Sequence, residues 1–205
     1  MIIRVFNTGI SRGAAVYEYL HSQFDANGDR RTVDPVELRG DANRFQRLID
    51  ECHRKWRYTS GVVSFSDFDR PDEDVQNEIM DAFEDFAFAG KDRSTWDIYW
   101  VRHQDKGNTE LHFVIPRVDL ETGQDLNAFQ RGWDAHWRPF QRDICFQYGL
   151  ADPHERRKVT ASPTAKRETK ERQALRTALY QKIEDGFKAG TINSRERLLT
   201  ILSSA

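Results

Sequence analysis

Two apolar segments joined by a short polar turn constrain the fold of this chain more than any other feature. Residues 96–103 and 109–118 are rich in aromatic and β-branched side chains, and a Lys-Gly pair lies between them. This pattern predicts a β-hairpin, because glycine supplies the positive φ that a tight turn favours. If the hairpin turns about Lys106-Gly107, residues whose numbers sum to 213 lie opposite each other, and His103 faces Glu110.

The predicted hairpin gathers three potential metal ligands on one face. His112 follows Glu110 by two residues, which is the period that places strand side chains on the same side. Directly opposed Cβ atoms lie about 4.5–5.5 Å apart, so His103, Glu110 and His112 are close enough to share one ion. Imidazole and carboxylate ligands suit Mn²⁺ or Zn²⁺, whereas Mg²⁺ prefers oxygen ligands. The alternative interpretation is a polar strand face that binds no metal.

Hydrophobic periodicity predicts further elements around the hairpin. The additional strands are expected at residues 2–6 and 58–65. The expected helices share helix-compatible or apolar-periodic patterns and cover residues 13–24, 44–52, 75–86 and 133–148, the last ending before Gly149. Residues 25–40 are polar and contain several Asp and Gly residues, so they are interpreted as a loop. The helix at 75–86 is expected to lie on the sheet.

Charge is distributed unevenly along the 205 residues. The whole chain has a net charge of −2, which by itself argues against a basic nucleic-acid-binding protein. Residues 1–153, however, carry 27 acidic and 19 basic side chains, a net of −8, whereas residues 154–182 carry nine basic side chains and three Glu, a net of +6. A basic segment on an acidic domain indicates contact with the DNA backbone, and the alternative is a solvated helix face. The residues expected to bind DNA are Arg156, Arg157, Lys158, Lys166, Arg167, Lys170 and Arg172.

The same region marks a domain boundary. Two prolines and many polar residues at 151–168 predict a linker, and residues 171–187 and 194–202 are expected to be helical. We therefore expect a globular domain over residues 1–153 and a basic linker with a helical extension over residues 154–205.

Other features exclude several protein classes. No window approaches the roughly 20 apolar residues of a membrane span, and the N-terminal segment is too short for a signal peptide. We therefore expect a cytoplasmic protein without membrane insertion. Cys52 and Cys145 do not form a C-x-x-C pair, so buried thiols are expected rather than a disulfide or a zinc knuckle.

A second group of reactive side chains lies in the predicted helix 13–24. It contains Tyr17, Tyr19 and His21. A tyrosine at such a position is usually part of the core, but a phenol becomes a nucleophile when a cation or a base favours its phenolate. If this helix packs over the hairpin, a tyrosine and the metal ligands meet.

The segment from His103 to Pro116 resembles the metal motif of the mobilisation relaxases of small colicin-type plasmids. In that family a His is followed after seven residues by a Glu and after two more by an Asn. Here His112 occupies the Asn position, as in the two-histidine pattern of other relaxases. The resemblance extends to residues 58–65, 119–123 and 149–153, and covers about the first 155 residues.

This resemblance implies an α+β fold of the His-hydrophobic-His (HUH) endonuclease class, with a central antiparallel sheet flanked by helices. It implies a metal-dependent enzyme that nicks and rejoins one DNA strand at a plasmid transfer origin through a 5′-phosphotyrosine. The family context of the nucleophile matches Tyr19 best, with Tyr17 and His21 as alternatives. The implied cofactor is Mn²⁺ or Mg²⁺, with Zn²⁺ possible by ligand type.

The implied partners are single-stranded and duplex DNA at the origin, accessory mobilisation proteins and a coupling protein. Two other functions use the same residues differently. One is a non-catalytic DNA-binding module for replication initiation or an accessory role. The other is a metal phosphodiesterase that attacks through water and leaves no covalent adduct.

Overall fold

The computed structural model describes residues 1–6, 9–25, 28–104 and 107–153, together with parts of the segment 178–197. The chain forms two compact units, Met1–Glu155 and Arg156–Ala205. In the second unit the described residues include helical positions between 178 and 188, after which the backbone turns at Gly190 and Ile192 is buried. The residues expected to bind DNA lie outside the described residues; they are Arg156, Arg157, Lys158, Lys166, Arg167, Lys170 and Arg172.

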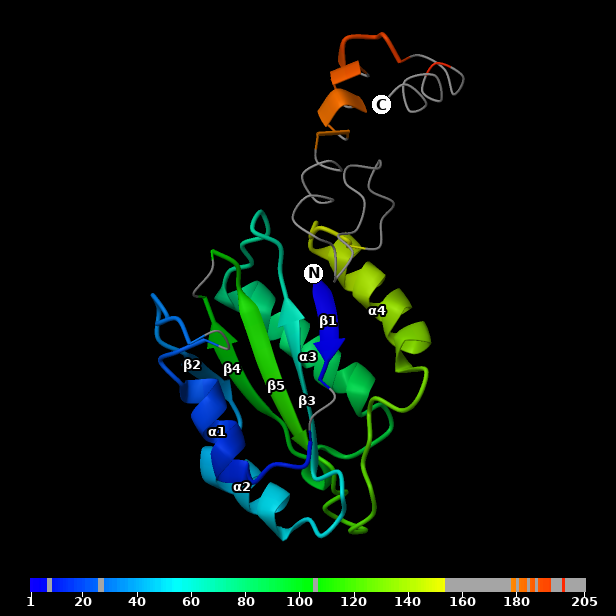
Figure 1. Cartoon of the computed structure of the whole chain (residues 1–205). Helices are drawn as coiled ribbons and strands as arrows, with labels where there is room; N and C mark the ends of the chain where they lie inside the picture. Colours follow the sequence, from blue (N-terminus) through cyan, green and yellow to red (C-terminus); the bar gives the residue numbers. More distant parts are fainter. Residues whose placement is uncertain are drawn as a thin grey trace. The chain divides into compact units, whose positions relative to one another are not determined.

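A five-stranded sheet forms the centre of the first unit (Figure 1). Its strands lie in the order β1-β3-β5-β4-β2, and all neighbouring pairs are antiparallel. The strands are β1 (Ile2–Val5), β2 (Val36–Arg39), β3 (Tyr58–Ser64), β4 (Tyr99–His103) and β5 (Glu110–Pro116). The hairpin β4–β5 therefore lies inside the sheet, where β3 and β2 flank it.

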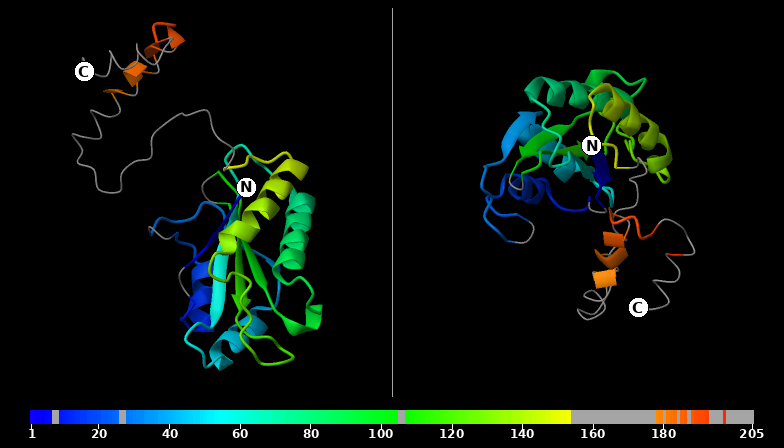
Figure 2. Two further views of the ribbon diagram at one scale, coloured as in Figure 1. Left: turned by 90° about the vertical axis from the view of Figure 1, so that its right-hand side faces the viewer. Right: turned by 90° about the horizontal axis from the view of Figure 1, so that it is seen from above.

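Helices cover both faces of this sheet (Figure 2). One layer consists of α1 (Gly13–His21) and α2 (Ala42–Glu51), and the other of α3 (Glu73–Ala87) and α4 (Trp133–Gln147). Each layer has its own core, because alternate strand residues point to opposite faces: Val101 and Val114 pack with α1 and α2, whereas Leu111 and Phe113 pack with α3 and α4. The predicted α+β fold with an antiparallel sheet is confirmed.

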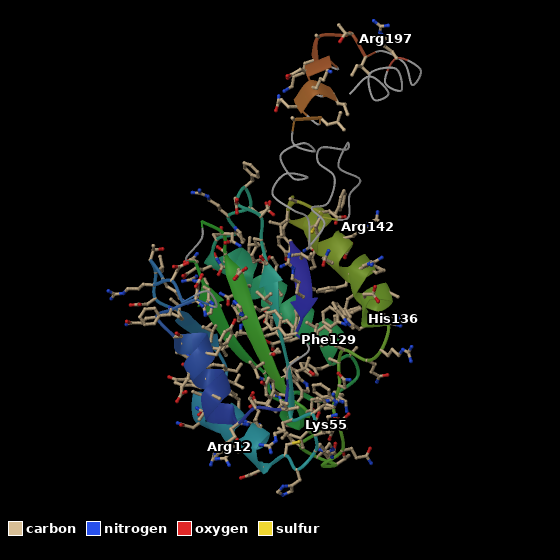
Figure 3. All side chains as sticks on the ribbon, viewed as in Figure 1. Arg12, Lys55, Phe129, His136, Arg142 and Arg197 are labelled. Atoms are coloured by element: carbon tan, nitrogen blue, oxygen red, sulfur yellow. The ribbon has the colours of Figure 1, made fainter. Side chains whose placement is uncertain are left out.

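The larger core is built mainly from aromatic rings. Phe83 of α3 lies within ring-contact distance of Trp100 at 5.0 Å, Phe113 at 4.8 Å and Trp137 at 4.8 Å between centroids. Phe129 stacks on Trp137 at 4.5 Å between the sheet and α4 (Figure 3). Such aromatic contacts bury large apolar areas, which explains how a chain with many charged residues sustains a core.

Several predicted boundaries were wrong, including the end of the helix expected at residues 13–24, which stops at His21. Residues 25–40, interpreted as a loop, contain strand β2, whose four residues pair with β4 at the edge of the sheet. A strand this short has too few residues for a clear alternation, so only its pairing partner makes it a strand. The strand expected from Trp96 begins at Tyr99, because Arg93–Thr95 forms a short 3₁₀ helix and Trp96 stacks on Phe88 at 3.9 Å.

Local signals explain where the helices begin and end. The Asp41 and Asp72 carboxylates accept hydrogen bonds from the backbone N–H groups three residues later, which caps α2 and α3. Gly149 has a φ of +62°, and Leu150 N–H donates to the Cys145 carbonyl at 2.8 Å, so α4 ends as the sequence predicts. Within the described parts of the chain, no helix is long and apolar enough to cross a membrane.

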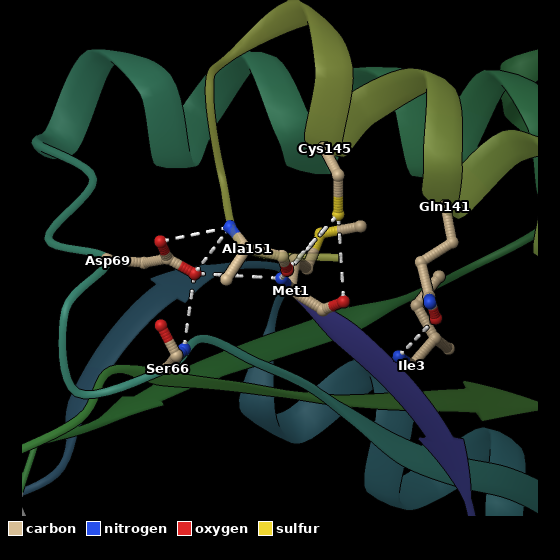
Figure 4. A network of polar contacts seen from close by, with 7 residues as sticks. All are labelled: Met1, Ile3, Ser66, Asp69, Gln141, Cys145 and Ala151. Atoms are coloured by element: carbon tan, nitrogen blue, oxygen red, sulfur yellow. Dashed lines mark hydrogen bonds and ion pairs between the residues drawn. The ribbon is translucent and has the colours of Figure 1, made fainter. Parts of the chain in front are cut away.

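The edge strand β1 is fixed by polar contacts at its start (Figure 4). The Met1 amino group lies 3.6 Å from the Asp69 carboxylate and donates to the Ala151 carbonyl. Ile3 N–H donates to Gln141 Oε1 of α4 at 2.9 Å. These contacts hold β1 to the loop that begins after β3 and to the end of α4.

The two cysteines are buried and carry free thiols, as predicted. Cys145 lies on α4 next to the Met1 amino group, 3.5 Å from its nitrogen. Burial raises the pKa of the Cys145 thiol, so it remains protonated at neutral pH.

Candidate active site

The hairpin has the predicted register. His103 pairs with Glu110 and Val101 pairs with His112, and Gly107 in the turn has a φ of +79°. Glu110 and His112 consequently project to the face of α1 and α2, together with His103. A shift of one residue would move these side chains to the opposite face of the sheet.

The three predicted metal ligands lie together at one end of this face. The His103 and His112 rings are 4.2 Å apart between centroids, and His112 Nε2 lies 3.4 Å from Glu110 Oε2. Ser64 of the neighbouring strand donates to Glu110 Oε1 at 3.3 Å. Contact with His112 lowers the pKa of Glu110 in spite of burial, so the carboxylate is ionised.

A hydrogen bond between His103 and α1 determines which ring nitrogen carries the proton. His103 is 1% exposed, and its Nε2 lies 2.8 Å from the carbonyl oxygen of Leu20. A carbonyl only accepts, so Nε2 carries a proton and the lone pair of the neutral ring lies on Nδ1. This hydrogen bond orients the ring and joins the last turn of α1 to the hairpin.

His112 supplies the clearest indication that the site accepts a ligand. It is 5% exposed, and neither of its ring nitrogens makes a hydrogen bond with a described residue. Its Nε2 lies 3.4 Å from Glu110 Oε2 without a well-formed hydrogen bond, and buried imidazole nitrogens normally have one, so the ring can still bind a ligand. The described residues do not place three ligand side chains close enough to enclose an ion, yet the donor set fits one.

A pocket of about 670 Å³ lies beside these ligands, between α1 and the sheet. Tyr19 and His112 both line it, together with Phe6 and mostly apolar side chains. Tyr19 is 47% exposed, so its hydroxyl is accessible to a large substrate. The helix that carries the predicted nucleophile therefore packs over the hairpin, which is the arrangement on which that prediction depended.

Tyr17 and His21 belong to a different group of contacts. Tyr17 stacks on His21 at 4.2 Å, and neither residue lines the pocket. His21 Nε2 lies 2.8 Å from Tyr99 Oη, which donates its single proton to Glu37 Oε2 at 2.8 Å. His21 must therefore donate to Tyr99. Burial and the Glu37 carboxylate raise the pKa of Tyr99, so this hydroxyl keeps its proton, while burial lowers the pKa of His21.

Several residues of this region were not found from the sequence. The Leu20 carbonyl has no sequence signal, because any residue supplies one. Ser64 and Glu37 are brought to the site by strand pairing with β5 and β4. Phe6 could have been noticed, since it follows the apolar strand β1 at the two-residue period.

Comparison with known proteins identifies the class. A family model described as relaxase, MobA/VirD2-like, nuclease domain, matches residues 23–150, which include the whole hairpin. The chain therefore belongs to the relaxase family, in agreement with the resemblance of its metal motif.

Individual relatives can also be named. The DNA relaxase MbeA of Escherichia coli is 33% identical over 211 residues, covering 100% of this chain and 39% of that protein. Cryptic plasmid protein C of Neisseria gonorrhoeae is 33% identical over 178 residues, covering 83% of this chain and 82% of that protein. This chain thus spans about 39% of the length of the E. coli relative. No solved structure matches it.

The Tyr99 hydroxyl is expected to stabilise the docking of α1. Tyr99→Phe removes the hydrogen bonds to both His21 and Glu37, and should lower the free energy of unfolding by about 1–2 kcal/mol. Chemical denaturation measures this difference. Tyr17→Phe is the matched control, because the Tyr17 hydroxyl makes no hydrogen bond with a described residue. Equal stability of the two variants would contradict the role given to Tyr99.

Proposed function

We propose that this chain nicks and rejoins one DNA strand at a plasmid transfer origin, and thereby initiates mobilisation of the plasmid. The observation that carries the proposal is that one pocket is lined by both Tyr19 and His112, whose ring nitrogens make no hydrogen bond with a described residue. Membership of the relaxase family supports this reading of the pocket. The names of the relatives, a DNA relaxase and a plasmid protein, agree with it.

Tyr19 is the proposed nucleophile. Its Oη attacks the scissile phosphorus, the phenolic proton passes to a base, and the bond from phosphorus to the 3′ oxygen breaks. The 3′ oxygen gains a proton and leaves as a hydroxyl, while the 5′ phosphate remains joined to Tyr19 as a diester. Because the ester replaces one phosphodiester by another, a 3′-hydroxyl can later attack it and reseal the strand without a further energy source.

His103, Glu110 and His112 are the residues that would hold a divalent metal ion. The bound ion, Mn²⁺ or Mg²⁺ and less readily Zn²⁺, would act as a Lewis acid on the phosphate oxygens. His103 would bind through Nδ1, since Nε2 donates to Leu20. His112 would provide one of its ring nitrogens, neither of which makes a hydrogen bond with a described residue, and Glu110 its ionised carboxylate. The Leu20 hydrogen bond then acts as the outer contact that orients a ligand imidazole.

The covalent intermediate gives the decisive test. Supercoiled plasmid with the cognate origin, incubated with the protein and Mn²⁺ or Mg²⁺, should yield a protein–DNA adduct on denaturing gels. Tyr19→Phe should abolish the adduct, because it removes the attacking oxygen, and Tyr17→Phe should retain it. An adduct formed by Tyr19→Phe would show that another residue attacks. Nicking that leaves no adduct would indicate that water attacks the phosphate. DNA binding without any nicking would indicate a non-catalytic DNA-binding module.

Metal binding is tested separately from nicking. Calorimetric titration with Mn²⁺ should show one site in the wild-type protein. His112→Leu should weaken binding at least tenfold, since loss of even an outer-shell partner commonly costs 10–100-fold. His136→Leu is the matched control, because His136 is exposed on α4 on the other side of the sheet (Figure 3). Unchanged affinity in His112→Leu would remove His112 from the ligand set.

We also propose that the basic residues between Arg156 and Arg172 bind DNA phosphates next to the origin. Residues 154–205 would then form an extension to a catalytic domain at residues 1–153. Accessory mobilisation proteins and a coupling protein are the partners that such a function implies.

Deletion of residues 154–205 should weaken binding of origin DNA and flatten its salt dependence, since each neutralised phosphate releases counterions. Anisotropy titrations at several salt concentrations measure both quantities. Identical affinity and salt slope in the truncated protein would exclude this role.

A further inference from the structure

The edge strand β1 presents two side chains to the proposed active-site face. Arg4 pairs with Val62, which in turn pairs with His112, so these three residues form one row across the sheet and share a face. Phe6 follows Arg4 by two residues and extends the pairing, because its N–H donates to the Ser60 carbonyl at 2.9 Å. Alternation along the strand therefore places Arg4 and Phe6 on the side of the metal ligands.

Phe6 forms one wall of the pocket that contains Tyr19. Its ring lies 6.4 Å from the His112 ring between centroids, and its side chain is half-buried. The remaining lining includes Tyr58, Val16 and Val114, so the pocket is apolar apart from a few hydroxyl and imidazole groups. A flat, apolar group can enter such a pocket and stack on an aromatic ring.

Arg4 is a cation without a structural role of its own. It is exposed and makes no ion pair or hydrogen bond through its side chain with a described residue. Several other arginines of this acidic unit form ion pairs, as Arg39 does with Asp81 and Arg117 with Asp125. Two strand spacings of about 4.8 Å separate the backbone at Arg4 from that at His112, which is within reach of a long side chain.

The position of β1 depends on a close approach to its neighbour. A Cβ added at Gly61 would lie 2.4 Å from the Arg4 carbonyl oxygen and 2.4 Å from Phe113 Cζ. Glycine at this point lets β1 lie against β3, with Phe6 lining the pocket and Arg4 on the same face of the sheet. Gly61 itself lines the pocket.

We propose that Arg4 and Phe6 form a binding site for one nucleotide adjacent to the scissile phosphate, Phe6 stacking on the base and Arg4 binding a phosphate. This proposal rests on the proposed function. It places a binding site for single-stranded DNA on the acidic unit itself. Stacking on an aromatic ring beside a cation is how proteins bind single-stranded nucleic acids without reading base edges. The open edge of β1 could instead pair with a peptide in an extended conformation. Such pairing is disfavoured, because Ile3 N–H at this edge already donates to Gln141.

Binding of short oligonucleotides tests the site without requiring cleavage. Fluorescein-labelled 12-nucleotide oligo(dT) and a 12-unit abasic backbone are titrated with the full chain in EDTA, and anisotropy gives both affinities. Phe6→Leu should weaken binding of oligo(dT) about tenfold, within the range known for one stacked base, and leave the abasic probe unaffected. Phe6→Tyr keeps the ring and should bind oligo(dT) as the wild type does.

Arg4→Gln should weaken binding of both probes and reduce the slope of log affinity against log salt by about 0.7, the value for one single-strand phosphate. Phe146→Leu and Arg142→Gln are matched controls, since both residues are exposed on α4, away from this face. Neither control should alter the affinity for oligo(dT) by more than about twofold, the scatter expected for surface changes.

The outcomes separate this inference from the proposed function. Base stacking would be overturned if Phe6→Leu lost the same affinity for both probes, or lost none. It would also be overturned if the wild-type protein bound neither probe. An unchanged salt slope in Arg4→Gln would overturn the phosphate contact. If the protein does not nick DNA but Phe6→Leu still weakens binding of oligo(dT) and not of the abasic probe, the chemistry assigned to Tyr19 is rejected. The nucleotide-binding site is then still supported.

Discussion

The register of β5 between its two neighbours is the constraint on which the rest of the site depends. Pairing with β4 sets His103 beside Glu110, and pairing with β3 sets Ser64 beside the same carboxylate. The alternate residues of β5 fill the aromatic core on the other face, so a slip of one residue would turn Glu110 into that core and Phe113 toward α1 and α2. Hydrophobic burial and the placement of the ligands therefore require the same register.

The second constraint is the docking of α1 on this sheet. Its last turn is held at two successive residues, by the Leu20 carbonyl to His103 and by His21 to Tyr99. Gly13 at its start allows close contact with α2, since a Cβ there would lie 2.5 Å from the Gln46 Cα. A helix held at both ends presents Tyr19 to the pocket in a defined orientation, which would lower the entropic cost of positioning the proposed nucleophile.

Charge acts locally in this protein. The acidic unit has an unfavourable net charge for a DNA-binding domain, yet many of its carboxylates cap helices or pair with arginines on the surface. Arg4 is not part of these pairs and lies on the sheet face that carries His103, Glu110 and His112. The electrostatic potential at a bound DNA strand would be set by such nearby groups, because salt screens charges beyond about 8 Å at physiological ionic strength.

The sequence alone predicts the hairpin, its register and the common face of His103, Glu110 and His112, because a two-residue period and a glycine turn are local properties. It also predicts the end of α4 before Gly149. Tertiary contacts, in contrast, make β2 a strand, bring Tyr19 rather than Tyr17 to the pocket beside His112, and let the Leu20 carbonyl orient His103. Those features arise from contacts between residues far apart in the chain, which local periodicity does not encode.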